Sequence, residues 1–191
     1  MLMLSSLCGY VQADVVVVDS CDSYDLVTDA LGIGNESFDF STYDGSFTSV
    51  GVVTSSGTVE VSATSGLEGV LGSYLMTDSI GDTLVIDFEE EVKAVGGNFF
   101  LIDQFQLPVV GLMELELSDG TTFLTSLRSD GGFAGFISSR ATIESLTLRG
   151  YGASVFAAPA VSSLKIGVVP APAGLALFGC VGLVRSRKRR H

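Results

Sequence analysis

The feature that most constrains the fold is an alternation of apolar and polar residues in several short stretches. Between residues 83 and 88 the side chains of Leu84, Ile86 and Phe88 occupy every second position, and between residues 113 and 117 two glutamates alternate with three apolar residues. Successive side chains of a strand point to opposite faces, so a period of two predicts strands with one buried and one wet face. Such strands are typical of antiparallel sheets.

Further stretches with strand composition are separated by Gly, Asp and Ser. They cover residues 15–18, 47–53, 58–63, 94–102, 121–124, 133–137, 143–148 and 161–168. Many short strands at this spacing favour two packed antiparallel sheets. We therefore predict an all-β fold, an antiparallel β-sandwich or jelly roll, as a single domain over residues 14–168.

Local signals add detail to this prediction. Asp119-Gly120 lies between two predicted strands and indicates a tight hairpin of type I′, in which both central residues have positive φ. Gly96 and Gly97 indicate a bulge or a close backbone approach. Residues 23–31 are the one predicted helix, with Ser23 as N-cap and an apolar face formed by Leu26, Val27, Ala30 and Leu31.

The last part of the chain has a different character. An uncharged apolar run extends from Ala173 to Val184, and a basic cluster follows it directly: Arg185, Arg187, Lys188, Arg189 and Arg190. The positive-inside rule places such a cluster on the cytoplasmic side of a membrane and the preceding domain across it. Twelve helical residues span only about 18 Å of a hydrocarbon core of about 30 Å. We therefore expect a short C-terminal hydrophobic helix with a basic tail, a transmembrane segment that anchors the protein only transiently.

The residues before this run complete a recognisable pattern. Val169, Pro170, Ala171 and Pro172, then the apolar run, then the basic cluster resemble the PEP-CTERM sorting domain of bacterial surface proteins in order and spacing. The family usually has Glu at the position of Ala171. The resemblance implies that residues 169–191 are handled by an exosortase, in bacteria that make exopolysaccharide. An ordinary single-pass anchor is the alternative interpretation.

An exported protein also needs a signal at its other end. Residues 1–13 contain apolar side chains at Leu2, Met3, Leu4 and Leu7, and residues 11–13 form an acceptable cleavage site. No positive residue precedes them. We expect residues 1–13 to be a signal peptide that is shortened at its start.

Charge and cysteine content fit an extracytoplasmic domain. With 22 acidic and five basic residues, the chain before Pro170 has a formal charge of −17. This charge disfavours nucleic acid as a partner and favours cations or polysaccharides. Cys8 and Cys180 lie in the two terminal segments, so Cys21 is left without a disulfide partner in the domain.

Catalytic motifs are nearly absent. The single histidine, His191, lies in the tail, which excludes Ser-His-Asp, Cys-His and histidine-ligated metal chemistry in the domain. Glu114 and Glu116 share one face of a strand at a separation of about 7 Å, a spacing that a glycosidase could use. They also fit the solvent side of an alternating strand, and we expect no enzymatic activity.

Calcium and carbohydrate are the two ligand hypotheses. Asp19, Asp22 and Asp25 form one cluster of oxygen donors suited to calcium, with further pairs at Asp39 and Asp44 and at Asp78 and Asp82. A solvated acidic loop is the competing interpretation of each cluster. Candidate sugar-stacking aromatics are Phe99, Phe100, Phe105, Tyr43, Tyr74 and Tyr151.

The sequence thus predicts a non-enzymatic cell-surface or extracellular-matrix protein. Its role would be structural or adhesive, linked to exopolysaccharide, with carbohydrate or calcium binding as its mechanism. It would contact an exosortase-like enzyme and, through its tail, the inner membrane. A secreted polysaccharide-active enzyme that uses carboxylates alone is the alternative.

Overall fold

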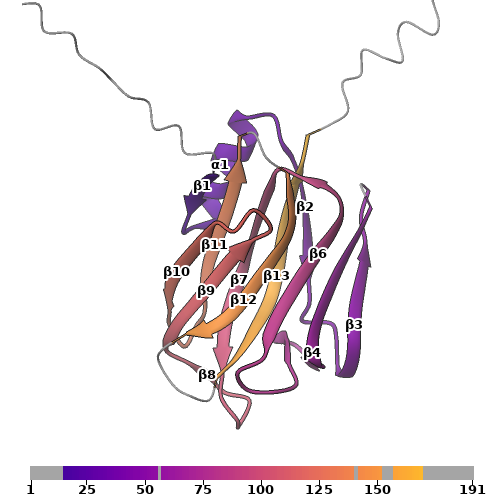
Figure 1. Ribbon diagram of the computed structural model, residues 1–191, viewed down its shortest axis with the longest axis vertical. Helices are drawn as coiled ribbons and strands as arrows, with labels where there is room; N and C mark the ends of the chain where they lie inside the picture. Colours follow the sequence, from indigo (N-terminus) through magenta and orange to yellow (C-terminus); the bar gives the residue numbers. More distant parts are fainter. Residues whose placement is uncertain (1–14, 56, 140–141, 152–156, 170–191) are drawn as a thin grey trace, which may run out of the picture.

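The computed structural model describes residues 15–55, 57–139, 142–151 and 157–169. This part of the chain forms one short helix, α1 (Cys21–Ala30), and a single antiparallel sheet of 13 strands (Figure 1). The strands are β1 (Val15–Val18), β2 (Gly34–Asp39), β3 (Gly45–Val53), β4 (Thr58–Val70), β5 (Tyr74–Thr77), β6 (Thr83–Val92), β7 (Ala94–Ile102), β8 (Pro108–Val109), β9 (Gly111–Leu117), β10 (Thr122–Leu127), β11 (Gly132–Ser138), β12 (Ile143–Tyr151) and β13 (Ala158–Val168). The all-β prediction is confirmed.

The strands follow the order β1-β11-β7-β13-β5-β4-β6-β12-β9-β10, with β2 paired to β13, β3 to β4 and β8 to β7. The sheet curls, so β10 at one end of this path packs against β11 and β7 near the other end. Phe123 of β10 and Phe136 of β11 mark the contact, with ring centroids 6.1 Å apart in an edge arrangement. The apolar face of the curled sheet is therefore turned inward on itself.

The predicted alternation fills this interior. Leu84 and Ile86 are fully buried and Phe88 is 8% exposed, while Asp87 between them lies on the outside. Met113, Leu115 and Leu117 are buried in the same way, with Glu114 and Glu116 on the other face. Each fully buried side chain of this size contributes about 1.5–3 kcal/mol by leaving water. The period of two therefore fixes which face of each strand enters the core.

The hairpin at Asp119-Gly120 is present, but its turn type is not the predicted one. Strands β9 and β10 pair with Thr122 opposite Glu116, and Gly120 has φ of +83°. Among the described residues, Gln106 is the one non-glycine residue with positive φ, so Asp119 does not have the conformation that a type I′ turn needs. The Asp119 carboxylate instead accepts a hydrogen bond from the backbone N–H of Thr121, 2.8 Å away. A three-residue loop with a left-handed glycine at its end replaces the two-residue turn.

Helix α1 lies close to its predicted place, but its cap and its buried face differ from the prediction. Ser20 is the N-cap, because its hydroxyl accepts the backbone N–H of Ser23 at 3.2 Å. Tyr24 and Thr28 are the buried residues of the helix, whereas Leu26 and Leu31 are 72% and 57% exposed. Of the predicted apolar face, Val27 packs against the buried cluster below the helix, and the prediction is wrong for Leu26, Ala30 and Leu31.

The reason lies in the sheet below the helix. The Tyr24 ring packs over Gly96 of β7 and Gly135 of β11, where an added Cβ atom would lie 3.1 Å and 2.7 Å from ring carbons of Tyr24. At Gly97, an added Cβ would lie 2.7 Å from the carbonyl oxygen of Ser163 on β13. The close backbone approach predicted for the glycine pair is thus confirmed, and the glycines form a slot that selects an aromatic ring.

Strand register defines two ends of the molecule. Ala94 at the start of β7 pairs with Ile137 of β11 and with Gly167 of β13. The start of β1 and the end of β13 lie at this end of the sheet, because Val15 pairs with Ser138, next to Ile137. Ile102 at the other end of β7 pairs with Ala158 and Pro108. Figure 1 shows the chain leaving the sheet toward both termini at the same end, opposite to β8.

Candidate functional site

Six exposed carboxylates lie close together along β4, β6 and β12. We call this group the acidic strip; it comprises Glu60, Asp87, Glu89, Glu90, Glu91 and Glu144. Glu60 and Asp87 are direct cross-strand partners in the pairing of β4 with β6. Like charges in opposite positions of a sheet destabilise it, so the strip concentrates negative charge at a cost in stability.

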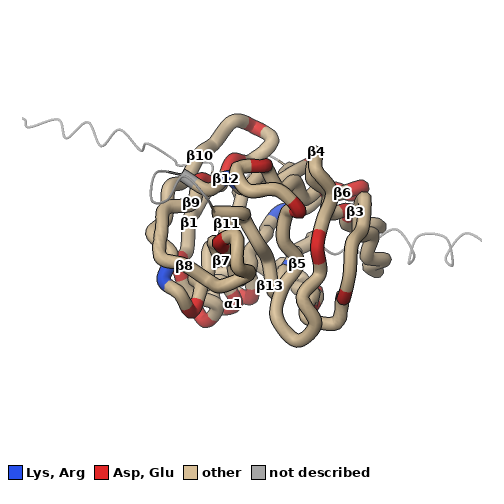
Figure 2. Tube along the Cα trace, turned by 90° about the horizontal axis from the view of Figure 1, so that it is seen from below, with Lys and Arg blue, Asp and Glu red and all other residues tan. Residues whose placement is uncertain are grey.

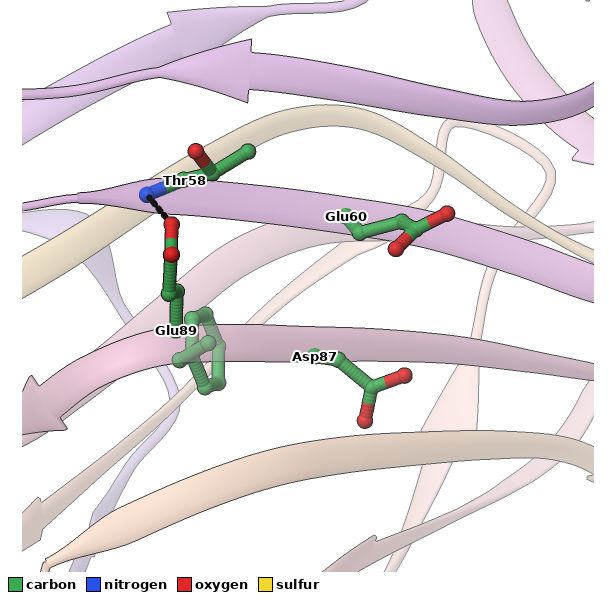
Figure 3. A pocket seen from close by; sticks show the side chains of 5 residues that line it. Thr58, Glu60, Asp87 and Glu89 are labelled. Carbon is green, nitrogen blue, oxygen red and sulfur yellow. Dashed lines mark hydrogen bonds between the residues drawn. The ribbon is translucent and has the colours of Figure 1, made fainter.

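Two open depressions follow the acidic strip. The first has a volume of about 360 Å³ and is lined by Thr58, Glu60, Asp87, Phe88 and Glu89. The second has a volume of about 260 Å³ and is lined by Phe88, Glu89, Glu90, Glu91, Thr142 and Glu144. Figure 3 shows Glu60 and Asp87 on neighbouring strands and Glu89 directed at the backbone of Thr58, whose N–H it accepts at 3.1 Å.

The electrostatics of the strip are dominated by its own charge. Partial burial raises the pKa of the Asp87 carboxyl, and the negative charge of Glu60 opposite adds to this effect. Figure 2, a view from below, shows Asp and Glu spread over strands and loops with few Lys or Arg among them. Such a surface attracts cations through its long-range field.

The acidic strip is better suited to attracting cations through its electric field than to holding one metal ion or to acid–base catalysis. Within the described residues, no group of three or more Asp, Glu, His or Cys side chains has the arrangement to hold a metal ion. General acid or base catalysis also needs a carboxyl group placed in a cleft, and all six members of the strip are exposed.

The pair considered for glycoside hydrolysis has a partner that the sequence did not indicate. Arg149 of β12 donates from Nη1 to Glu114 Oε1 at 3.2 Å and to Glu116 Oε2 at 2.6 Å. These hydrogen bonds, to Glu116 first and Glu114 second, raise the pKa of the guanidinium. Two carboxylates held by one cation on an open strand face are an ion-pair cluster that stabilises the sheet surface.

The proposed calcium cluster is also placed differently from what calcium would need. Both carboxylate oxygens of Asp25 lie 2.7 Å from Nζ of Lys165 on β13. Burial opposes the charge on Lys165, but the hydrogen bonds and electrostatic interactions of Lys165 with Asp25 and Cys21 together outweigh burial and raise the pKa of the ammonium. Asp22 is in the first turn of α1 and Asp19 precedes its N-cap, both exposed. The structure therefore uses Asp25 to attach α1 to β13.

Two further acidic candidates accept hydrogen bonds from backbone N–H groups. Asp39 accepts from Ser41 at 2.9 Å, which lowers the pKa of Asp39. Asp82 accepts from Ser65 and Thr83, each at 2.7 Å, and although burial opposes the shift these bonds lower its pKa. Asp39 therefore stabilises a local turn, whereas Asp82 connects the start of β6 to β4.

Most of the candidate stacking aromatics belong to the interior. Phe99 is fully buried, Phe100 packs against Tyr74, and Tyr43 packs between Phe40 and Phe47. Phe105 is 72% exposed and is the one aromatic side chain of this kind among those that the structure describes. The side chain of Tyr151 lies outside the described residues.

The terminal segments lie largely beyond the described part of the chain. Val169 is the last described residue and is exposed, while residues 1–13, the rest of the sorting motif from Pro170, the apolar run and the basic cluster are outside it. In the part that the structure covers, no helix has the length and apolar character needed to cross a membrane.

Comparison with protein-family models, with curated proteins and with solved structures gave no match for this chain. The acidic strip is the feature that sequence reasoning missed. Its run of three glutamates at 89–91 is visible in the sequence, but Glu60 and Glu144 join it only through strand pairing.

Proposed function

We propose that this chain is an exported, non-enzymatic protein of the cell surface or extracellular matrix, sorted by an exosortase-like enzyme. The observation that carries the proposal is the order of three elements at the C-terminus. Residues 169–172, the apolar run to Val184 and the basic cluster from Arg185 follow one another without a gap. The inner membrane would hold the tail briefly during this processing.

The domain before the tail would act structurally or as an adhesin linked to exopolysaccharide. Its formal charge of −17 supports cations and polysaccharides as partners and opposes nucleic acid. We further propose that the curled sheet is a β-sandwich, an interpretation supported by the packing of Phe123 against Phe136 between distant strands. A rigid acidic β domain of this kind suits a hydrated polymer layer.

A non-enzymatic role is supported by the state of the carboxylates. Glu114 and Glu116 share Arg149, and the acidic strip is exposed along its length. Acid and base roles use carboxyl groups held in a cleft with different surroundings, which an open strand face does not provide.

The sorting proposal is tested by the intact mass of the mature protein from cells that express the full chain. A mass that corresponds to loss of the segment after Pro172 is expected. As a matched variant, Pro170→Ala with Pro172→Ala should slow this loss, whereas Arg128→Lys, far from the motif, should leave it unchanged. A mature protein that still ends in His191 overturns the proposal.

The non-enzymatic proposal is tested by incubating the chain with exopolysaccharide, with and without calcium. Co-sedimentation without release of reducing ends is expected. Turnover that disappears in Glu114→Gln but persists in Glu60→Gln would instead establish the enzyme alternative.

A further inference from the structure

Four side chains form one row across the neighbouring strands β11, β7, β13 and β2 (Figure 1). Phe133 of β11 pairs directly with Asn98 of β7. Asn98 pairs in turn with Ser163 of β13, and Ser163 pairs with Asp39 of β2. We call these four residues the cross-strand row. Neighbouring strands lie about 4.8 Å apart, so the row extends over about 14 Å, and directly paired residues share a face of the sheet.

The contacts of the row place it on the outer face of the sheet. The Phe133 ring packs against Tyr24 of α1, with ring centroids 5.8 Å apart. Nδ2 of Asn98 donates a hydrogen bond to Oγ of Ser163 at 2.9 Å, so these two side chains share a face. Asp39 is exposed, and the residue before it packs against the core. The row therefore faces away from the interior of the curled sheet.

The zones on either side of the cross-strand row are covered by protein. On one side, Lys165 of β13 is bonded to Asp25 of α1 at 2.7 Å. On the other side, Phe100 of β7 packs against Tyr74 of β5 over a small buried cluster. Asn98 lies between these two zones and is exposed. Within the described residues, this face of the sheet is thus open along the row.

The side chains of the row match the surface of a sugar ring. Such a ring has hydroxyl groups at its edge, each both a donor and an acceptor, and an apolar face of C–H groups. The Asp39 carboxylate accepts hydrogen bonds, and the Asn98 amide both donates and accepts them. Because Oγ of Ser163 accepts from Asn98, its own hydrogen can be donated to a further acceptor. Phe133 provides an apolar surface beside these polar groups.

Two members of the row are held in place by the fold itself. The Phe133 ring lies over Gly96 and Gly135, where an added Cβ would be 2.8 Å and 3.1 Å from its ring carbons. Ser41 donates its backbone N–H to Asp39 at 2.9 Å, and this hydrogen bond lowers the pKa of the Asp39 carboxyl. Side chains that are fixed in advance lose less conformational entropy when a ligand binds.

Charge restricts the class of sugar. Asp39 is the one formally charged member of the row, and the chain before Pro170 carries a charge of −17. This field repels an anionic polysaccharide and has no such effect on a neutral one. We propose that the cross-strand row binds a neutral polysaccharide, with Phe133 against the face of a sugar ring and the three polar members at its hydroxyl groups. This inference rests on the proposed link to exopolysaccharide and adds a site and a ligand class to it.

Native gel electrophoresis of the full chain, with a polysaccharide cast into the gel, tests the proposed site. The net charge of −12 moves the chain toward the anode, and binding to the polysaccharide retards it. The neutral probes are hydroxyethyl cellulose, galactomannan and dextran, and alginate is the anionic comparison. Retardation by at least one neutral polysaccharide is expected, and it should persist with EDTA because the proposed contacts involve no metal. Alginate should not retard the chain.

Substitutions in the row should weaken this retardation. Asn98→Ala removes an amide that donates and accepts, and the apparent dissociation constant should rise roughly tenfold. Phe133→Leu keeps an apolar side chain but removes the aromatic ring, and it should weaken binding by a similar factor. Gln104→Ala is the matched control, because it removes an exposed amide that follows β7 and lies outside the row. Thermal unfolding of each variant establishes that the fold is intact, and the exposed position of Asn98 makes that substitution the safer of the two.

The outcomes distinguish this inference from the proposed function. Retardation that is unchanged in both Asn98→Ala and Phe133→Leu overturns the cross-strand row as the site but leaves polysaccharide binding by the domain in place. Retardation by none of the neutral polysaccharides also overturns the inference, whereas the mass of the mature protein tests the proposed sorting separately. Retardation that is lost with EDTA, or that is stronger with alginate, overturns it as well and indicates binding through bridging cations.

Discussion

Two pairs of carboxylates on the outer face of the sheet have opposite electrostatic surroundings. At Glu114 and Glu116 the neighbouring strand supplies Arg149, whose Nη1 reaches both carboxylates. At Glu60 the neighbouring strand supplies Asp87, a second negative charge, and the pKa of Asp87 rises through partial burial and this repulsion. Both arrangements use the same exposed strand surface. The acidic strip is therefore due to the residue types at these positions and is not required by the fold.

The largest change should come from giving the strip the missing cation. Glu60→Lys replaces a repulsive cross-strand pair with an attractive one and should raise the free energy of unfolding by about 1 kcal/mol. Urea denaturation measures the change. Asp44→Lys alters net charge equally but lies outside the strip, so a similar gain there would attribute the effect to overall charge.

Removal of Arg149 should leave Glu114 and Glu116 as uncompensated as the carboxylates of the acidic strip. Arg149→Met leaves Glu114 and Glu116 without their cation and should lower the free energy of unfolding by about 0.5 kcal/mol, a small value because the cluster is half exposed. The same denaturation experiment checks it. Arg128→Met, which removes another exposed arginine, should change stability less; an equal loss would contradict a specific role for Arg149.

The strip should also be recognisable from its pH dependence. Because the folded pKa of Asp87 lies above its unfolded value, its contribution to stability is present at acidic pH and is lost as pH rises through the folded pKa. Asp87→Asn should therefore match the unaltered chain below pH of about 3.9 and be slightly more stable above the raised pKa, by a small amount because solvent screens the exposed Asp87.

Thermal unfolding measured as a function of pH tests this difference. The contribution of Asp39 to stability should have the opposite pH dependence. Its folded pKa is lowered by Ser41, so the stability it contributes is present above its unfolded pKa and is lost as pH falls. Asp39→Asn should be less stable than the unaltered chain at neutral pH and equal to it in acid. The same sign for both variants would show that the two carboxyl groups do not differ as described.

The smallest effect expected is that of salt on these differences. Raising the ionic strength from about 0.01 M to 1 M shortens the screening length from about 30 Å to 3 Å. The gain in Glu60→Lys and the loss in Arg149→Met should both shrink, by about half, in denaturation curves at the two salt concentrations. Differences that do not change with salt would indicate packing effects of the new side chains.

Much of the fold could be predicted because its strands carry the signal locally. β7 has the predicted bounds, and β6 and β9 contain the predicted alternation with its buried face. β2 and β5 were missed for different reasons. β2 is mostly polar, and all four residues of β5 are buried, so neither shows a period of two.

What the sequence could not supply depends on residues far apart along the chain. The buried face of α1 is set by Tyr24 because Gly96 and Gly135 leave room for its ring, while the more apolar Leu26 stays in water. The acidic strip and the ion pairs of Arg149 arise in the same way, from strand pairing that no local pattern reveals. Phe105 is exposed on the loop after β7, and its residue type alone gives no sign of this.

The central position of β13 has a consequence for how this chain becomes a folded protein. In the described sheet, β13 joins β7 on one side to β5 on the other, and it is the strand to which β2 pairs. No hydrogen-bonded strand therefore joins the two halves of the described sheet until this last described strand has been synthesised. Pairing of this non-local kind cannot be completed while most of the chain is still being synthesised. The edges of β5 and β7 that later bind β13 thus remain unpaired for most of the synthesis of the chain, and one strand added at the end closes both.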